Sequence, residues 1–351
     1  MFSDTFITLG KILSAACGSA NDVELGFNDE INSLRQLAYE CCNFNGWFSP
    51  QFVNMQLGSI AKMLDANAIK AFEEKYELGN IGLTDKKVKV IAAGNIPLVC
   101  FHDMFCVLSA GFKLVIKYSS KDNVLPRAVV GILQRINPLL KDRIIEETAQ
   151  NIPFDAIIAT GSNNSARYFD YYFSKYPNII RCNRNSVAVL SGNESADDYR
   201  LLADDIFAYY GLGCRSVSKI YVPQGFNYDT FFGNILFMSD IAANAKYSDN
   251  YTYNKAIYLM SGAKFLDNGF IILKNDEGFS SPVGVLYCQE YLNIDSLSTH
   301  LRQNRDKLQC VVSNIAIEDI ATVPFGCAQH PRIDDFADGV DTVEFLKSIS
   351  R

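Results

Sequence analysis

The sequence predicts an α/β protein with a parallel sheet, and the first observation behind this prediction is a βαβ pattern. A strand pattern at residues 87–93 leads through a turn to a helical stretch at 98–110, and Gly111 separates this stretch from a second strand at 113–120. Strand, helix and strand in this order pair the two strands in parallel. The second observation is the length of 351 residues, which is enough for two lobes with a full core.

The composition is typical of a soluble globular protein in a reducing compartment. Hydrophobic residues make up 48% and charged residues 20% of the chain. The net charge of −7 argues against a nucleic-acid surface, which needs clustered lysine and arginine. The ten cysteines show no paired spacing and no Cys-x-x-Cys, so neither a disulfide framework nor a metal site is expected. We therefore expect a cytoplasmic protein.

Residues 1–83 are predicted to be helical, and they carry no motif. Helical patterns lie near residues 32–42, 49–64 and 68–76. The N-terminus faintly resembles a signal peptide, but Asp4 precedes any positive side chain and Lys11 interrupts the apolar stretch. An amphipathic surface helix is therefore the preferred interpretation.

Residues 96–116 are mostly apolar over a length that could span a membrane. Pro97, His102, Asp103 and Lys113 lie within this stretch and argue against a span. We therefore expect no membrane span here.

Residues 84–188 are predicted to form one lobe around the parallel sheet. Ligands at such sheets gather at the carboxyl ends of the strands, where Asn95, Lys117 and the pair Ser119–Ser120 lie. After the second strand, the pattern predicts helices near 126–137 and 142–151, a strand at 154–160, a helix at 163–175, and strands at 178–181 and 186–190.

A second lobe is predicted for residues 189–323, followed by a C-terminal segment at 324–351. Residues 197–210 are typical of an amphipathic helix with acids in its first turns. Gly211 and Gly213 are expected to end this helix before a strand at 219–223. Further strands are predicted at 269–274, 283–288 and 309–313.

Cys214 lies on the glycine-flanked elbow between this helix and this strand. Such an elbow can expose both the sulfur and the backbone N–H of the cysteine to a substrate, as covalent catalysis by a thiol requires. The alternative is an inert small core residue, which is the commoner fate of a single cysteine.

Five segments, in this order, resemble the sequence boxes of the aldehyde dehydrogenase superfamily. Within it the chain looks most like the LuxC-type acyl-CoA reductases, whose best-known member supplies aldehyde to bacterial luciferase. The resemblance runs from about Val88 to the C-terminus. The matching segments are Gly94-Asn-Ile-Pro-Leu98, Ser109-Ala-Gly-Phe-Lys-Leu-Val-Ile-Lys117-Tyr-Ser-Ser120, Ala159-Thr-Gly-Ser162, Gly211-Leu-Gly-Cys214, and the tail from Pro324-Phe-Gly-Cys-Ala-Gln329 to Leu346.

The resemblance implies an aldehyde dehydrogenase-like fold, with residues 84–188 as the nucleotide-binding lobe, residues 189–323 as the catalytic lobe, and residues 324–351 returning to the interface between the lobes. It also implies the NADPH-dependent reduction of a fatty acyl-CoA, or a related acyl thioester, to the aldehyde. Cys214 would form the acyl-cysteine intermediate, and its backbone N–H together with the side chain of Asn95 would stabilise the oxyanion. An acyl-transferase or a synthetase is the partner implied. The alternative role for Asn95 is that of a turn residue before proline.

The resemblance also assigns residues to the cofactor. Lys117 would contact the adenosine ribose or its phosphate, with a solvated strand end as the alternative. Ser120, after Ser119, stands where many NAD-specific relatives carry a glutamate, and Lys121 adds positive charge, which favours NADPH over NADH. The run Thr160-Gly161-Ser162 is expected to hold the pyrophosphate at a helix N-terminus.

Two departures from the superfamily pattern affect the predicted chemistry. Arg181 stands where hydrolytic members carry the glutamate that activates water, and arginine cannot accept a proton. Reduction or acyl transfer is therefore favoured over hydrolysis, although Glu194 is a conceivable substitute base. Glu277, in a box one residue longer than usual, is a candidate for holding the nicotinamide ribose, with a solvated loop acid as the alternative.

Two rival functions stay open at this point. One is a CoA-acylating aldehyde dehydrogenase that works in the oxidative direction, and the other is a non-catalytic binding protein on the same fold. The three histidines do not decide between them, because His102 is expected to be structural, His300 exposed on a polar helix, and His330 a loop residue.

Overall fold

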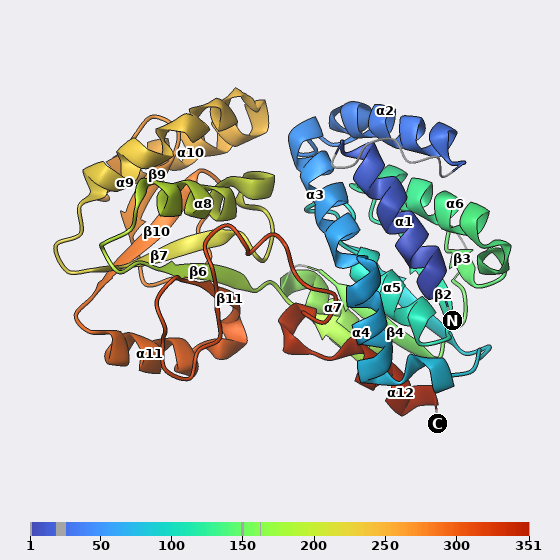
Figure 1. The fold of residues 1–351 in the computed structure, drawn as a ribbon. Helices are drawn as coiled ribbons and strands as arrows, with labels where there is room; N and C mark the ends of the chain where they lie inside the picture. The colour runs from blue at the N-terminus through green and yellow to red at the C-terminus, as the bar shows by residue number, and fades with distance from the viewer. Residues whose placement is uncertain (1, 19–25, 149–150, 162, 351) are drawn as a thin grey trace. The chain divides into compact units, whose positions relative to one another are not determined.

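The computed structural model describes residues 2–18, 26–148, 151–161 and 163–350. The chain divides into two compact units. Unit 1 consists of Met1–Asn183 and His330–Arg351, and unit 2 consists of Arg184–Gln329. Figure 1 shows both units, each with helices packed on a sheet.

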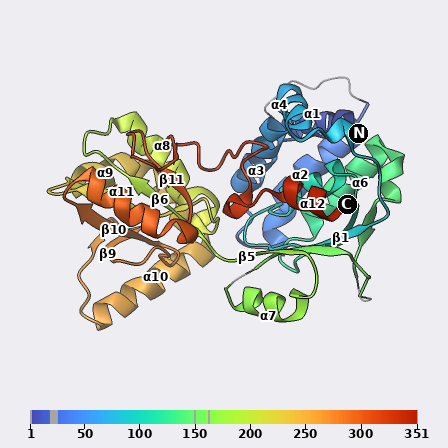
Figure 2. The ribbon, with the colours of Figure 1, turned by 90° about the horizontal axis from the view of Figure 1, so that it is seen from below.

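Unit 1 is built on a five-stranded parallel sheet with the strand order β3-β2-β1-β4-β5. The predicted βαβ pattern accounts for its centre, where Val88 pairs with Leu114. Figure 2 shows α7 on one face of this sheet and α6 and α12 on the other. The strands are β1 (Lys87–Ile91), β2 (Lys113–Lys117), β3 (Ile144–Glu146), β4 (Ala156–Thr160) and β5 (Asn178–Arg181), and the helices beside them are α5 (Phe101–Ser109), α6 (Val124–Ile136), α7 (Asn163–Phe173) and α12 (Thr342–Ser350).

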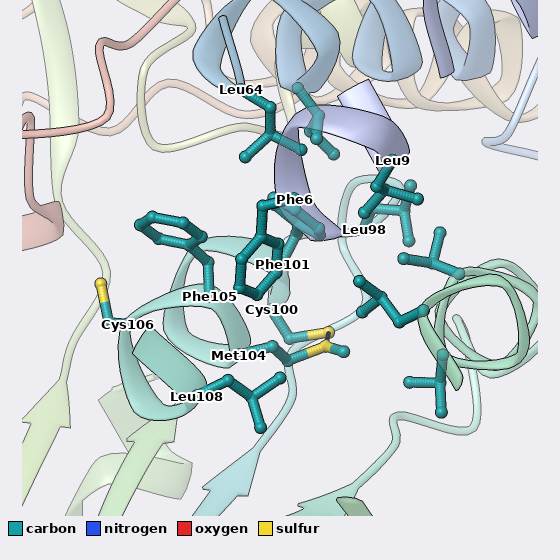
Figure 3. Packing of buried hydrophobic residues seen from close by; sticks show 14 of the residues in the cluster. Phe6, Leu9, Leu64, Leu98, Cys100, Phe101, Met104, Phe105, Cys106 and Leu108 are labelled. Carbon is teal, nitrogen blue, oxygen red and sulfur yellow. Dashed lines mark hydrogen bonds between the residues drawn. The ribbon is translucent and has the colours of Figure 1, made fainter. Parts of the chain in front are cut away.

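The N-terminal helices of unit 1 share one hydrophobic core with α5 and the sheet (Figure 3). The helices are α1 (Ser3–Ala16), α2 (Asn28–Phe44), α3 (Pro50–Met63) and α4 (Ala66–Tyr76), followed by a 3-10 turn at Leu78–Asn80. The helix predicted at the N-terminus is α1, which exposes Asp4 and Lys11 and packs its apolar side into the core. Phe6 and Leu9 of α1 are at most 1% exposed. A Cβ atom at Gly10 would lie 2.9 Å from Leu64 Cβ, so this glycine lets α1 approach the end of α3 closely.

The predicted helix at 142–151 is wrong. Residues Pro138–Lys141 form a 3-10 turn, and Ile144–Glu146 form the edge strand β3. The open edge of β2 explains the difference, because Leu114 N–H donates to the carbonyl of Arg143 (2.8 Å) and Glu147 N–H donates to that of Ile116 (2.8 Å). Pairing with a neighbouring strand outweighs the weak local preference for a helix.

Unit 2 contains a seven-stranded sheet with the order β12-β11-β6-β7-β10-β9-β8, parallel except for the β8–β9 pair. Figure 1 shows α8, α9 and α10 on one face and α11 on the other. The strands are β6 (Asn185–Val189), β7 (Val217–Pro223), β8 (Leu266–Asp267), β9 (Ile272–Asn275), β10 (Val285–Tyr291), β11 (Leu308–Val312) and β12 (Thr322–Val323). The helices are α8 (Ala196–Phe207), α9 (Tyr228–Ile235), α10 (Ala245–Met260) and α11 (Ile294–Gln303), with 3-10 turns at Ala208–Gly211, Leu236–Ala243 and Arg305–Lys307; a further 3-10 turn at Ala337–Gly339 belongs to unit 1.

Within the described part of the chain, no helix combines the length and the apolar character that crossing a membrane would need.

Candidate active site

Cys214 lies in the turn between α8 and β7, and its side chain is exposed. The turn is unusual because Tyr209, Tyr210 and Gly211 are all left-handed, with φ of 54°, 58° and 75°. Residues other than glycine rarely adopt this left-handed backbone conformation, and each one that does lowers the stability of the fold by about 1 kcal/mol or more. Both tyrosines are buried, and the ring centroid of Tyr210 lies 6.0 Å from that of Tyr247. Burial of the rings therefore stabilises the turn.

The same turn corrects the predicted end of the preceding helix. α8 ends at Phe207, before the two glycines that were expected to end it. The left-handed tyrosines reverse the chain first, and Ser216 closes the loop by donating from its backbone N–H to Gly213 (3.0 Å) and from its hydroxyl to Ala208 (3.2 Å). The position of Cys214 is therefore set by backbone geometry on both sides.

Ser186, at the start of β6, fixes the Cys214 peptide from the neighbouring strand. Its hydroxyl is buried and lies 2.9 Å from the carbonyl oxygen of Cys214, to which it donates. Since this hydrogen bond fixes the Cys214 carbonyl toward β6, the backbone that carries the sulfur has a defined orientation before a substrate binds. A positioned thiol of this kind is what nucleophilic catalysis requires.

Glu277 lies in the loop between β9 and β10, and its side chain is exposed. The loop is anchored on β7, because the Lys219 ammonium donates to the Glu277 carbonyl (3.0 Å) and the Ser218 hydroxyl donates to the Phe279 carbonyl (2.6 Å). Unit 2 thus brings the Glu277 loop to the first residues of β7, which directly follow the Cys214 turn. The contact of Glu277 with a nicotinamide ribose stays a prediction.

Sequence reasoning missed Lys219, a lysine with no exposed surface. Its ammonium also donates to Gln289 Oε1 (2.7 Å) and lies 4.9 Å from the ring centroid of Tyr221. Burial lowers the pKa of Lys219 to about 8. The available signal was a lysine in an inward-facing position of the strand pattern Val217-Ser-Lys-Ile-Tyr-Val, which charged residues seldom occupy.

In unit 1 the other predicted site residues share one edge of the sheet. Asn95 follows β1, Lys117 ends β2 with Ser119 and Ser120 after it, and Thr160 and Gly161 follow at the end of β4. Since β1, β2 and β4 are parallel, these carboxyl ends meet at the same edge. Ser162 lies outside the described residues.

The loop that carries Asn95 is held by a buried carboxylate. Leu98 is left-handed, with φ of 53°, and its N–H donates to Asp122 Oδ2 (2.7 Å). Burial raises the pKa of Asp122 to about 7. A Cβ atom at Gly94 would lie 2.8 Å from Ser119 Cβ, so the loops after β1 and β2 touch at this glycine. Asn95 itself is exposed.

A cavity of about 450 Å³ lies beside this edge, and Lys117 is part of its lining. Its walls include the aromatic side chains of Phe154, Tyr172 and Tyr176, and the Phe154 and Tyr176 rings lie 4.6 Å apart. Lys89 lines it as well, in a buried ion pair with Glu147 (2.6 Å). The connection from β3 to β4 forms no helix over its described residues 147–148 and 151–155, and several of these residues line the cavity.

The size and lining of this cavity fit the adenosine half of a nicotinamide dinucleotide. Ligand pockets of about 300–1,000 Å³ commonly combine apolar and aromatic walls with a few polar groups. Here the aromatic rings offer a face to a base, and the exposed ammonium of Lys117 offers a positive charge to a phosphate.

Arg181, on β5, is a structural residue. Its guanidinium donates to Asp103 of α5 (2.6 Å) and to the Thr342 hydroxyl at the start of α12 (3.1 Å), and it is 5% exposed. A buried, ion-paired guanidinium cannot act as a base.

The histidines differ in their surroundings. His102 is partly buried, and its Nε2 lies 2.8 Å from the Ile333 carbonyl oxygen, as expected of a structural residue. The expectation of an exposed His300 is wrong, because this residue is partly buried and its Nε2 lies 3.1 Å from the Tyr221 hydroxyl. His330 lines a second cavity in unit 1.

Comparison with solved structures gives consistent matches. Aldehyde dehydrogenase 21 from Physcomitrella patens, solved with succinate, is 12% identical, with 98% of this chain and 84% of that chain covered at a TM-score of 0.64. An oxidoreductase from Marinobacter aquaeolei is 12% identical, with 98% and 82% covered at a TM-score of 0.66. An NAD-dependent aldehyde dehydrogenase from Sinorhizobium meliloti is 13% identical, with 92% and 76% covered at a TM-score of 0.63.

Comparisons of sequence alone find less. No protein-family model matches the chain, and no curated protein matches it. The similarity therefore concerns the fold, which is shared over nearly the whole chain at low identity. The parallel sheet of unit 1 and the mixed sheet of unit 2 form an aldehyde dehydrogenase-like α/β fold, as predicted.

Proposed function

We propose that the protein reduces a fatty acyl-CoA to the aldehyde with NADPH, through an acyl thioester on Cys214. The observation that carries the proposal is the exposed thiol of Cys214 on a turn fixed by left-handed tyrosines and by Ser186. On an aldehyde dehydrogenase-like fold, such a thiol supports covalent chemistry at a carbonyl carbon. The shared fold supports this proposal at the level of an aldehyde-converting oxidoreductase.

The proposed first step is attack of the Cys214 thiolate on the thioester carbonyl carbon. The new carbon–sulfur bond forms, the bond to the CoA sulfur breaks, and CoA leaves as its thiol after taking up a proton. The backbone N–H of Cys214 and the amide of Asn95 are proposed to donate to the oxygen while it carries negative charge; one such donor contributes about 3 kcal/mol.

The bound nicotinamide cofactor supplies a hydride, which converts the acyl group into an aldehyde and releases Cys214 as the thiolate. The residues proposed to hold the cofactor are Lys117, which lines the aromatic cavity, with Ser119 and Ser120 after it in the chain, the run Thr160-Gly161-Ser162, and Glu277. Lys117 and the neighbouring Lys121, with no carboxylate at Ser120, favour NADPH; NADH is the alternative.

Two side chains support reduction over hydrolysis. Arg181 is occupied by Asp103 and cannot activate water. Glu194, the conceivable substitute base, accepts hydrogen bonds from the Ser191 hydroxyl (2.8 Å) and from the Gly192 N–H (3.0 Å). These bonds use both of its carboxylate oxygens to hold the turn after β6, which makes Glu194 a poor candidate for a base.

The test is to supply acyl-CoAs of increasing chain length without reduced cofactor and to measure the mass of the Cys214 peptide. We expect a mass increase equal to the acyl group, which NADPH discharges as aldehyde and added CoA discharges as thioester. Cys214→Ala should abolish the mass increase and the release of aldehyde and thioester. Cys327→Ala, which removes another exposed cysteine of unit 2, should leave them unchanged. Rapid release of free acid without cofactor would contradict the proposal and indicate a thioesterase.

A further inference from the structure

Unit 1 contains a second cavity, separate from the residues assigned above. It measures about 420 Å³ and lies between α3, α4 and the chain segment His330–Asp334. None of the predicted catalytic or cofactor residues lines it. Its volume lies within the range of about 300–1,000 Å³ that is typical of pockets for small molecules.

The walls of this cavity are mainly apolar. Met63 of α3, Phe72 of α4 and Ile333 are buried side chains that line it. Ala68 and Ala71 also line it, and their spacing of three residues places both on one face of α4. Two small side chains on the same helical face leave the space open, so the cavity suits a flexible apolar chain.

The charged side chains of the lining favour an anion. Lys62, Lys75 and Arg332 are cationic, and Asp334 is the carboxylate among the lining residues. Asp334 is shared, because it lies 3.2 Å from the Lys75 ammonium and 2.9 Å from the Arg332 guanidinium. The lining therefore keeps a positive surplus, in a chain whose net charge is −7.

His330 adds a polar atom without a partner. Its Nδ1 is buried, and no described residue forms a hydrogen bond with it. Burial, and then the charge of Lys62, lowers the pKa of His330, so the ring is neutral near pH 7. The positive charge beside the ring is therefore that of Lys62.

From these observations we infer that the cavity binds a fatty carboxylate. The alkyl chain lies against Met63, Phe72 and the two alanines, and the carboxylate lies near the ammonium of Lys62. This inference does not rest on the proposed function, because the cavity belongs wholly to unit 1 and its occupancy is measured as binding.

The test is calorimetric titration of the full chain with octanoate, decanoate and dodecanoate below their micelle concentrations. Each added methylene that enters the cavity should lower Kd about threefold to fourfold. Octanol and decanol, which lack the charge, should bind more weakly than the acids of equal length. Cys214→Ala should bind dodecanoate like the unchanged protein, which separates this test from the test of the proposed function.

Two pairs of variants locate the site. Ala71→Phe fills the cavity from an exposed position of α4 and should weaken binding at least about tenfold, whereas Lys70→Phe on the opposite face should not. Lys62→Met should weaken binding about threefold, and Lys70→Met, with the same loss of charge, should not. Thermal unfolding of each variant shows whether it is folded.

Three results would overturn the inference: a Kd that does not change with chain length, equal affinity for acids and alcohols, or undiminished binding to folded Ala71→Phe. If Ala71→Phe does not fold, the inference is overturned when Lys62→Met binds dodecanoate with unchanged affinity.

Discussion

Asp122→Asn should change how the stability of unit 1 depends on pH. Asp122 is 4% exposed, and burial raises its pKa from 3.8 to about 7 in the folded protein. A carboxyl group with a raised folded pKa contributes stability that is complete below about pH 4 and is lost as the pH rises through about 7. A difference of about three pKa units corresponds to at most about 4 kcal/mol. Asparagine keeps an oxygen for the N–H of Leu98 but does not titrate.

Trp47 makes the measurement specific. It is the one tryptophan of the chain, and its backbone N–H donates to Asn45, whose side chain in turn donates to the Lys121 carbonyl next to Asp122. Its fluorescence therefore reports the unfolding of unit 1. In urea titrations from about pH 4 to about pH 8, the unchanged protein should lose up to about 4 kcal/mol more unfolding free energy than Asp122→Asn.

The matched control is Asp29→Asn, which removes an exposed carboxylate of the same unit. Its pH profile should follow that of the unchanged protein. Parallel profiles for the unchanged protein and Asp122→Asn would refute the reasoning, since they would mean that Asp122 titrates alike in the folded and unfolded chains.

Three further substitutions test the site and its support. Asn95→Ala should lower kcat about a hundredfold with little change in KM, because one oxyanion donor is lost; an effect on KM alone would indicate a turn or binding role. Arg181→Gln should destabilise unit 1 by about 3–5 kcal/mol in Trp47-monitored urea titrations, because Asp103 stays buried without its partner, and a loss below about 1 kcal/mol would contradict that. Gly94→Ala should lower stability by about 1–3 kcal/mol, since its Cβ would lie 2.8 Å from that of Ser119; unchanged thermal unfolding would show that the loops can separate freely.

The sequence predicted the elements whose signal is local. The strand around Val88 alternates lysines with valines, the strand around Leu114 carries the apolar run Leu-Val-Ile, and Gly111 marks the turn between α5 and β2. The local pattern around Ile144 wrongly predicted a helix, whereas this segment pairs with β2 as a strand. A local pattern does not show the hydrogen-bonding edge that another strand supplies.

The candidate site divides in a similar way. The elbow position of Cys214 followed from the helix, glycine and strand pattern, and the structure places its side chain in solvent there. The local pattern did not predict three other features of the site: the left-handed tyrosines, the anchoring of the Glu277 loop by Lys219, and the buried carboxylate of Asp122. Each depends on partners distant in the chain, and periodicity carries no information about such partners.

The left-handed tyrosines before Cys214 also bear on how the site forms during folding. In an isolated chain Tyr209 and Tyr210 would favour ordinary backbone conformations, so the turn has no local reason to form early. It becomes stable only when the rings are buried, and for Tyr210 this requires the helix that carries Tyr247 to be in place. The geometry around the thiol is therefore a late product of folding, and a chain in which α10 has not docked exposes a cysteine without the arrangement that would make it a catalyst.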